Sequence, residues 1–474
     1  MYADTCFSFA IMKIEMDNNL PWQVKAYETL SSEKASIYFD VDDFEEIIDH
    51  YTLFGANQKA LQAAQYACKL HPGSVPLMIK NARLLASFNN EDHALALLDT
   101  VEKLDPSNND IYLTKGAIYS QMNHFEKAIE EYNKAVFDSE EPDFVYCNIA
   151  IEYENLGNFD KTIEYLNKAL EVNPDNDLAI YEAAYCFDLL SLTEEGIGFF
   201  QRLLERNPYS TEAWFNLGVS FVNAGLYEKA IDAMDYCLAI DEHHEHAWFH
   251  KGYTLNLMNR YEEAVSAYKA SIIDDETDAM KYYYIGECYE KLEDFFHARA
   301  YYLQTTHLDP EFSDAWIGIA ICEMENGSVK KAINYFEKGL SLDPGNASYL
   351  CLLANARFLL KEHDAASEAY EKALEIQPND EETWLEYAEA LTSVSETGNA
   401  YEVLKRGMET LPNHVNMLYS LAAVLFMQGK TKEGTLCLEE AYNNDNEGLN
   451  RLLNRFPKLT SMPEFMEVAD TLKR

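Results

Sequence analysis

Apolar residues recur along this chain at the spacing that places them on one face of an α-helix. In the segment 212–223 the apolar positions are Trp214, Leu217, Gly218 and Phe221, the i, i+3, i+4, i+7 pattern of an amphipathic helix. Gly225 follows, and glycine tolerates the left-handed conformation at a helix C-terminus. A second helix is predicted over 227–238. The local pattern therefore predicts a pair of helices joined by a tight turn.

The same pattern returns with a constant period, equal to the interval from Pro72 to Pro106. Eight of the 13 prolines share this register, namely Pro72, Pro106, Pro174, Pro208, Pro310, Pro344, Pro378 and Pro412. Twelve positions before the proline position stands a small residue in every unit, for example Ala60, Ala128 and Ala230. The turn between the two helices holds a residue that tolerates positive φ at Gly55, Asn89, Asn123, Gly157, Gly225, Asn259, Gly327 and Gly429. A helix pair this short cannot bury both of its helices alone, so stacking of successive pairs must supply the core.

These positions resemble a known repeat family. Trp214, Leu217, Gly218, Phe221 and Ala230, with Pro174 or Pro310 in other units, fall at the signature positions of the tetratricopeptide repeat. Segments such as FEKAIEEYNKAV and FDKTIEYLNKAL look like its second helix. The resemblance covers residues 41–448 of the 474-residue chain. It implies an all-α fold, a right-handed superhelical solenoid of helix-turn-helix repeats.

The register also predicts a domain organisation. Residues 1–40 form an N-terminal segment with a leading capping helix over 21–30, residues 41–448 form twelve repeats, and residues 449–474 form a C-terminal helical cap. The proline position is occupied by Glu140, Glu242, Glu276 and Asn446 in four units. We expect the turns between repeats to be less sharp there, since proline ends a helix.

Composition narrows the function classes. With 37 basic and 81 acidic residues the net charge is 37 − 81 = −44, so nucleic acid and anionic membranes are not expected partners. Nine cysteines without a Cys-x-x-Cys pair favour reduced thiols. Residues 1–16 form neither a secretory signal nor a membrane span, because Asp4 replaces a positive charge and the apolar run is short. We expect a cytoplasmic protein.

Candidate chemistry is sparse. Outside the repeats too few residues remain for a catalytic domain, so no enzyme and no cofactor is predicted. Gly429-Lys430-Thr431 resembles the end of a phosphate-binding loop, but the preceding glycine and strand are lacking. His243, His244, His246 and His250 lie close together in the sequence, and the last two have a spacing that can hold a metal. A metal- or ligand-responsive regulator therefore stays open as one alternative.

The outer face of the first helices is the most informative feature. The second, fifth and ninth positions of each repeat lie on this face. They are polar in the first repeat, whereas ten of the twelve such positions in repeats four to seven are apolar or aromatic. In the family this face lines the concave side where peptides or partner helices lie. The resemblance therefore implies a non-enzymatic scaffold that binds a peptide or partner protein in the concave groove. The partner-binding residues predicted in and beside these positions are Phe144, Asn148, Ile151, Tyr181, Tyr185, Phe215, Asn216, Val219, Asn223, Phe249, Tyr253 and Asn256; Cys147 and Leu178 occupy two further apolar positions.

Two alternatives concern the same face. Strong curvature could pack these side chains against neighbouring first helices and leave no open floor, and a groove or terminal repeat could instead dock a second copy to give a homo-oligomer. Family members that bind the terminal carboxylate of a peptide do so with lysine and arginine at the second, fifth or sixth positions. In this sequence only Lys80 occupies such a position, so this mode of binding is not expected. Acidic residues at Glu287, Glu290, Asp314 and Glu325 instead favour a partner with basic residues beside an apolar anchor.

Overall fold

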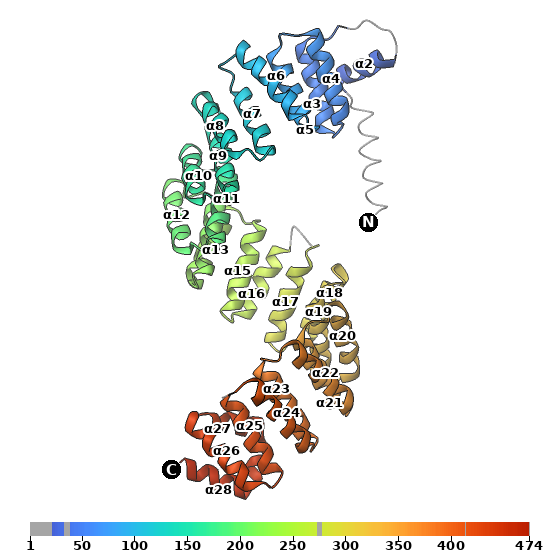
Figure 1. The fold of residues 1–474 in the computed structure, drawn as a ribbon, viewed down its shortest axis with the longest axis vertical. Coiled ribbons are helices and arrows are strands. Elements are labelled where there is room, and N and C mark those ends of the chain that lie inside the picture. The colour runs from blue at the N-terminus through green and yellow to red at the C-terminus, as the bar shows by residue number, and fades with distance from the viewer. Residues whose placement is uncertain (1–20, 33–37, 273–276, 413, 474) are drawn as a thin grey trace. The chain divides into compact units, whose positions relative to one another are not determined.

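The computed structural model describes residues 21–32, 38–272, 277–412 and 414–473, and all regular structure within these ranges is helical (Figure 1). The predicted all-α fold is confirmed. The interpretation of residues 1–16 lies outside the described residues. Residue contacts divide the chain into two compact units, Met1–Ile240 and Asp241–Arg474.

The helices alternate in pairs along the chain. The first helices of the pairs are α3 (Val41–Leu53), α5 (Val75–Ser87), α7 (Asn109–Gln121), α9 (Pro142–Asn155), α11 (Asp177–Leu189), α13 (Thr211–Asn223), α15 (Glu245–Leu257), α17 (Ala279–Lys291), α19 (Ser313–Glu325), α21 (Ala347–Leu359), α23 (Glu381–Ser393) and α25 (Val415–Met427). The second helices are α4 (Asn57–Leu70), α6 (Glu91–Leu104), α8 (Phe125–Ala135), α10 (Phe159–Val172), α12 (Thr193–Arg206), α14 (Tyr227–Ile240), α16 (Tyr261–Ser271), α18 (Phe295–Leu308), α20 (Val329–Leu342), α22 (His363–Ile376), α24 (Thr397–Thr410) and α26 (Thr431–Asn444). The second helices begin at a constant interval, from Asn57 and Glu91 through to Thr397 and Thr431.

The turn inside each pair has one conformation. Every residue of positive φ in the described part of the chain lies between a first and a second helix. The eight predicted from glycine or asparagine are among them, and the same position in the remaining pairs holds Ser191, Glu293, Lys361 and Ser395. The repeat register therefore fixes this backbone conformation even where the residue type does not favour it.

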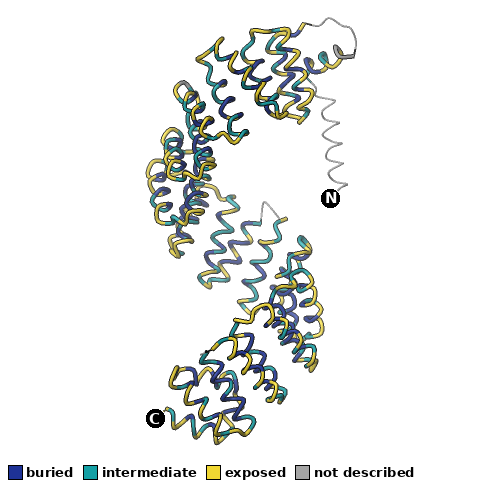
Figure 2. The backbone as a smooth tube through the Cα atoms, in the orientation of Figure 1, coloured by how far each residue is buried: buried dark blue, intermediate teal, exposed yellow. Residues whose placement is uncertain are grey.

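The core consists of the faces that the two helices of a pair turn toward each other and toward the next pair (Figure 2). The small-residue position of the second helix is fully buried at Ala60, Ala128 and Ala230. Separate buried clusters follow one another along each unit, as expected for a core built by stacking.

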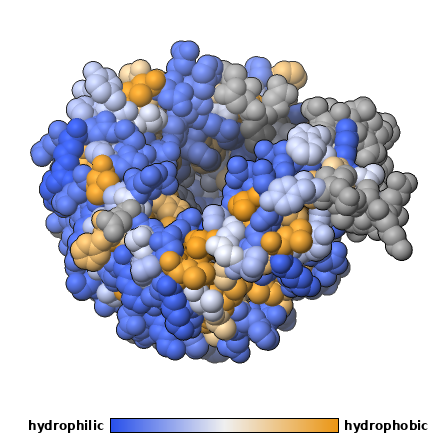
Figure 3. Space-filling view, turned by 90° about the horizontal axis from the view of Figure 1, so that it is seen from above, coloured by the Kyte–Doolittle hydropathy of each residue, from blue (hydrophilic) through white to orange (hydrophobic). Residues whose placement is uncertain are grey.

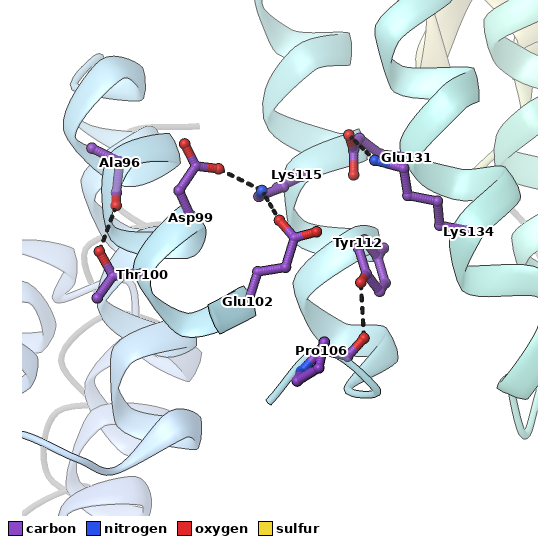
Figure 4. A network of polar contacts seen from close by, with 9 residues as sticks. All are labelled: Ala96, Asp99, Thr100, Glu102, Pro106, Tyr112, Lys115, Glu131 and Lys134. Atoms are coloured by element: carbon purple, nitrogen blue, oxygen red, sulfur yellow. Dashed lines mark hydrogen bonds and ion pairs between the residues drawn. The ribbon is translucent and has the colours of Figure 1, made fainter. Parts of the chain in front are cut away.

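Polar contacts between repeats supplement the apolar core. Lys115 of α7 is buried, and its Nζ lies 2.5 Å from Asp99 Oδ1 and 2.6 Å from Glu102 Oε2 of α6 (Figure 4). In the same view the Tyr112 hydroxyl donates to the Pro106 carbonyl at 2.8 Å. An aromatic residue closes this turn in four further repeats, where the indole N–H donates to the carbonyl at the proline position. These pairs are Trp214 with Pro208, Trp248 with Glu242, Trp316 with Pro310 and Trp384 with Pro378.

Two of the four units without the proline have a shorter second helix. α8 ends at Ala135 and continues as a 3₁₀ turn, η1 (Val136–Asp138), and α16 ends at Ser271, so each has 11 residues where the other second helices have 14. Glu276 itself lies outside the described residues. α14 and α26 keep the full 14 residues without a proline. Loss of the proline therefore permits an early helix end but does not require it.

Short helices flank the pairs at both ends. α2 (Trp22–Ser32) precedes them, and α27 (Gly448–Arg455), η2 (Pro457–Ser461) and α28 (Pro463–Leu472) follow. Leu449 and Leu452 of α27 are buried, and Arg455 pairs with Glu382 and Glu389 of α23. None of the described helices combines the length and apolar character that crossing a membrane requires. The division into segments 1–40, 41–448 and 449–474, with twelve repeats in the middle one, remains our proposal for the domain organisation.

Candidate functional site

Four apolar side chains on α9 and α11 face solvent, and we call them the aromatic stripe. Their exposed fractions are 48% for Phe144, 40% for Leu178, 66% for Tyr181 and 45% for Tyr185. The opposite side of α11 is part of a well-packed core through Ala179, Ile180 and Ala183. The stripe is thus the outer face of ordinary amphipathic repeat helices, with apolar residues where a solvated face would carry polar ones.

Other predicted residues of this unit are less accessible. Ile151, Phe215 and Val219 are half-buried. Cys147 corrects the helical-wheel expectation, because it is fully buried and its Sγ lies 3.7 Å from Oδ1 of Asn176, which caps α11. Cys147 of α9 therefore faces the start of the next first helix. At this position the side chain packs against a neighbouring first helix, and no open floor is left.

The predicted amides are partly engaged within the chain. Asn216 Nδ2 donates to the Glu212 carbonyl at 2.8 Å, and Asn223 Nδ2 donates to Asp188 Oδ1 at 3.2 Å. Together with Val219 they line a pocket of about 410 Å³ between α11 and α13, which we call the amide pocket. The amides therefore shape a depression beside the stripe.

A larger cavity lies on the other side of the stripe, between α7 and α9. Its volume is about 980 Å³, and we call it the acidic cavity. Phe144 and Asn148 of α9 form part of its wall, together with Asp110, Glu140 and Glu141. Arg83 of α5 reaches this wall, where its Nε donates to Thr114 Oγ1 at 3.0 Å and its Nη2 lies 3.4 Å from Asp110.

The sequence pattern did not predict this cavity. Phe144 and Asn148 of its wall were predicted as binding residues, whereas Arg83, Asp110 and Tyr132 were not. The one sequence feature that pointed to the cavity was Glu140, which replaces proline at the end of its repeat. Because α8 ends early in this repeat, η1 and residues 139–141 form the connection to α9, and residues 139–141 line the cavity.

The predicted residues of the second unit are packed among aromatic neighbours. The Phe249 ring lies 5.5 Å from Tyr268 and 5.6 Å from Tyr284, and Tyr253 lies 6.3 Å from Tyr284. Asn256 Nδ2 donates to Glu287 Oε2 at 3.3 Å. All three predicted residues are half-buried, so this part of the outer face is largely filled from within the unit.

The predicted acidic residues of the second unit also have partners. The Tyr302 hydroxyl donates to Glu290 at 2.8 Å, and the Tyr349 hydroxyl donates to Asp314. Burial raises the pKa of the Glu290 carboxyl, although its bond to Tyr302 opposes that shift. Glu325 is exposed. The acidic lining is therefore partly committed to internal hydrogen bonds.

The histidine cluster begins α15. His244 caps this helix, since its Nδ1 accepts from the Ala247 N–H at 3.0 Å. Burial lowers the pKa of His250 to about 4, and the nearby His246 and His244 add to the shift. Among the described residues no group of three or more His, Cys, Asp or Glu side chains is placed to hold a metal ion. The metal-responsive alternative gains no support from this geometry.

The regular helix pairs, their shared turn and their stacked core define a helical repeat protein. Models of the tetratricopeptide repeat match residues 110–136, 144–176, 200–245, 215–279, 289–347 and 347–380. The chain is a tetratricopeptide repeat protein. Proteins of this family typically serve as non-catalytic scaffolds for protein or peptide partners.

Comparison with solved structures gives similar helical proteins. The MamA protein is 23% identical with a TM-score of 0.34, and the match covers 35% of this chain and 92% of that one. The Cut9–Hcn1 hetero-tetramer of the APC/C gives 15% identity, a TM-score of 0.40 and coverage of 81% and 90%. YrrB, described as a TPR protein with an unusual peptide-binding site, gives 21% identity, a TM-score of 0.35 and coverage of 41% and 97%. No curated protein sequence matches the chain.

Proposed function

We propose that this protein is a non-enzymatic scaffold that binds a peptide or partner protein along the outer face of its first helices. The observation that carries the proposal is the aromatic stripe. Phe144, Leu178, Tyr181 and Tyr185 are large apolar side chains left exposed on two successive first helices. A group of exposed large apolar side chains is typical of interaction sites, and tyrosine and other aromatic residues are common anchors.

The structure supports a narrower location than the concave groove of repeats four to seven. The stripe occupies α9 and α11, and the amide pocket extends it to α13 through Asn216, Val219 and Asn223. In the second unit Phe249 and Tyr253 already contact Tyr284. We therefore centre the proposed site on the fourth to sixth predicted repeats.

A partner with basic residues fits the electrostatics. The chain carries a net charge of −44, and most of the face seen in Figure 3 is hydrophilic, with apolar side chains in separate groups. A cationic segment would be attracted over a distance of about 8–10 Å at moderate salt. Its apolar residues would then dock on the stripe. We propose a cytoplasmic location, where the cysteines stay reduced.

The test is a comparison of variants in cells that produce the protein. Partners are crosslinked and quantified by mass spectrometry for the native chain, for Tyr181→Ala combined with Tyr185→Ala, and for Phe296→Ala combined with Tyr38→Ala. The control residues are exposed aromatics outside the first helices. We expect the stripe variant to lose its main partner at least about tenfold, because each anchor contributes about 1–2 kcal/mol. Equal recovery with both variants would exclude the stripe as the binding site.

A further inference from the structure

We propose that the acidic cavity receives an arginine or lysine side chain of the bound segment, next to the apolar side chains held by the stripe. This inference rests on the proposed function and adds a specificity pocket to it. Phe144 belongs to both the stripe and the cavity wall. A segment lying on α9 and α11 can therefore place one side chain on the stripe and a neighbouring side chain in the cavity.

The wall of the cavity carries an excess of negative charge. Asp110, Glu140 and Glu141 face it, and the cation Arg83 is already held by Thr114 and Asp110. No described residue forms an ion pair with Glu140 or Glu141. Both carboxylates follow directly on one another before α9 and are exposed, so they are available to an incoming cation.

A buried carboxyl group, Glu152, lies close to the cavity wall, and burial raises its pKa although hydrogen bonds from Ser120 and Asn155 oppose that shift. Glu152 lies one helical turn beyond Asn148 on α9 and is only 3% exposed. Its Oε2 has no hydrogen-bond partner among the described residues. Burial raises the pKa of Tyr132, whose side chain lines the cavity, and the nearby Glu152 adds to that shift. A buried acceptor without a donor is unfavourable, and a cation in the cavity would stabilise its charged form.

The remaining wall suits a long basic side chain. Leu113 and Ala117 of α7 provide an apolar surface for a methylene stem. The polar groups Ser139, Asn148 and Glu141 also line the cavity, and a guanidinium or ammonium group can donate charge-assisted hydrogen bonds to them. An acidic side chain would be repelled by three carboxylates, and a purely apolar one would leave them desolvated.

The experiment uses the full chain and a synthetic peptide array. Each peptide carries a fixed leucine and phenylalanine anchor, and one neighbouring position is Arg, Lys, Gln or Glu. We expect Arg or Lys to be preferred over Glu by at least about tenfold. In Glu140→Gln combined with Glu141→Gln this preference should fall severalfold while anchor-dependent binding remains.

A matched control removes the same charge elsewhere. Glu194→Gln combined with Glu195→Gln changes two adjacent exposed carboxylates in the first turn of α12 and should keep the full preference. Binding that requires Tyr181 and Tyr185 but shows no preference for a basic side chain would overturn this inference and leave the proposed function standing. Absence of any binding that depends on the stripe would overturn both.

Discussion

The ring of Tyr132 lies directly against Gly116, so that a Cβ at Gly116 would come within 2.5 Å of it. The same relationship, at the same sequence separation, joins Gly252 with Tyr268 and Gly286 with Tyr302. The small residues of the first helices thus make room for large residues of the second helices. This contact determines how closely the two helices of a pair approach.

Substitution of this glycine should destabilise the first unit. Gly116→Ala forces the Tyr132 ring to move, and overpacking of this kind costs about 1–3 kcal/mol. Gly398→Ala is the control, because a Cβ at Gly398 of α24 meets nothing within 4 Å and alanine favours helix by about 0.5–1 kcal/mol. Urea unfolding followed by circular dichroism measures both. Equal midpoints for the two variants would contradict the proposed contact.

Turn residues of positive φ offer a stabilising change. Lys361 has φ of 62° and Glu293 has φ of 57°, conformations that side chains with a Cβ disfavour. We expect Lys361→Gly to raise the free energy of unfolding by about 0.5–1 kcal/mol. Lys372→Gly, inside α22, should lower it by about 1 kcal/mol. Thermal melts of the two variants should therefore shift in opposite directions, and a shift in the same direction would refute the argument.

The indole hydrogen bond across the inter-repeat turn can be removed without changing much of the packing. Trp214 Nε1 donates to the Pro208 carbonyl at 2.9 Å, and its ring stacks on Tyr236. Trp214→Phe keeps an aromatic ring but loses the donor, so we expect a loss of about 1 kcal/mol. Trp22→Phe, at a tryptophan that is mostly exposed, should have almost no effect. Denaturant titration compares the two, and an equal loss would argue against the hydrogen bond.

Stability of the second unit should depend on pH through His250. Burial holds its folded pKa at about 4, whereas an unfolded histidine has a pKa of about 6.5. Between these values the unfolded chain binds more protons, so the free energy of unfolding falls as pH drops from about 6.5 toward 4. The contribution of His250 is complete above about pH 6.5.

His250→Gln tests this dependence. The variant should lose part of the decrease in melting temperature between pH 7 and pH 5, because glutamine does not titrate. His243→Gln provides the comparison, since His243 lies on the surface beside Glu242. If His250→Gln and the native chain showed the same pH dependence, another group would be responsible.

The sequence predicted the fold, but it predicted only part of the surface on which we propose the site, for physical reasons. The regular repetition revealed the turn at Gly225 and Asn259, whereas Ser191 and Glu293 share that conformation without favouring it. Helical periodicity assigned Cys147 and Tyr181 to the same outward position, yet Cys147 is buried and Tyr181 exposed. The difference depends on how neighbouring first helices pack, which a periodicity within one helix does not contain. The acidic cavity arises in the same way, from the spacing between α7 and α9.

The central claim is that a partner binds on the aromatic stripe, and photocrosslinking tests it most directly. Tyr181→p-benzoylphenylalanine and, as a control, Phe296→p-benzoylphenylalanine are introduced separately into the full chain, and the producing cells are irradiated. We predict a defined crosslinked partner at position 181 that disappears when Tyr185→Ala is added, and no such product at position 296. A crosslinked product at 296 alone, or one at 181 that persists with Tyr185→Ala, would contradict it.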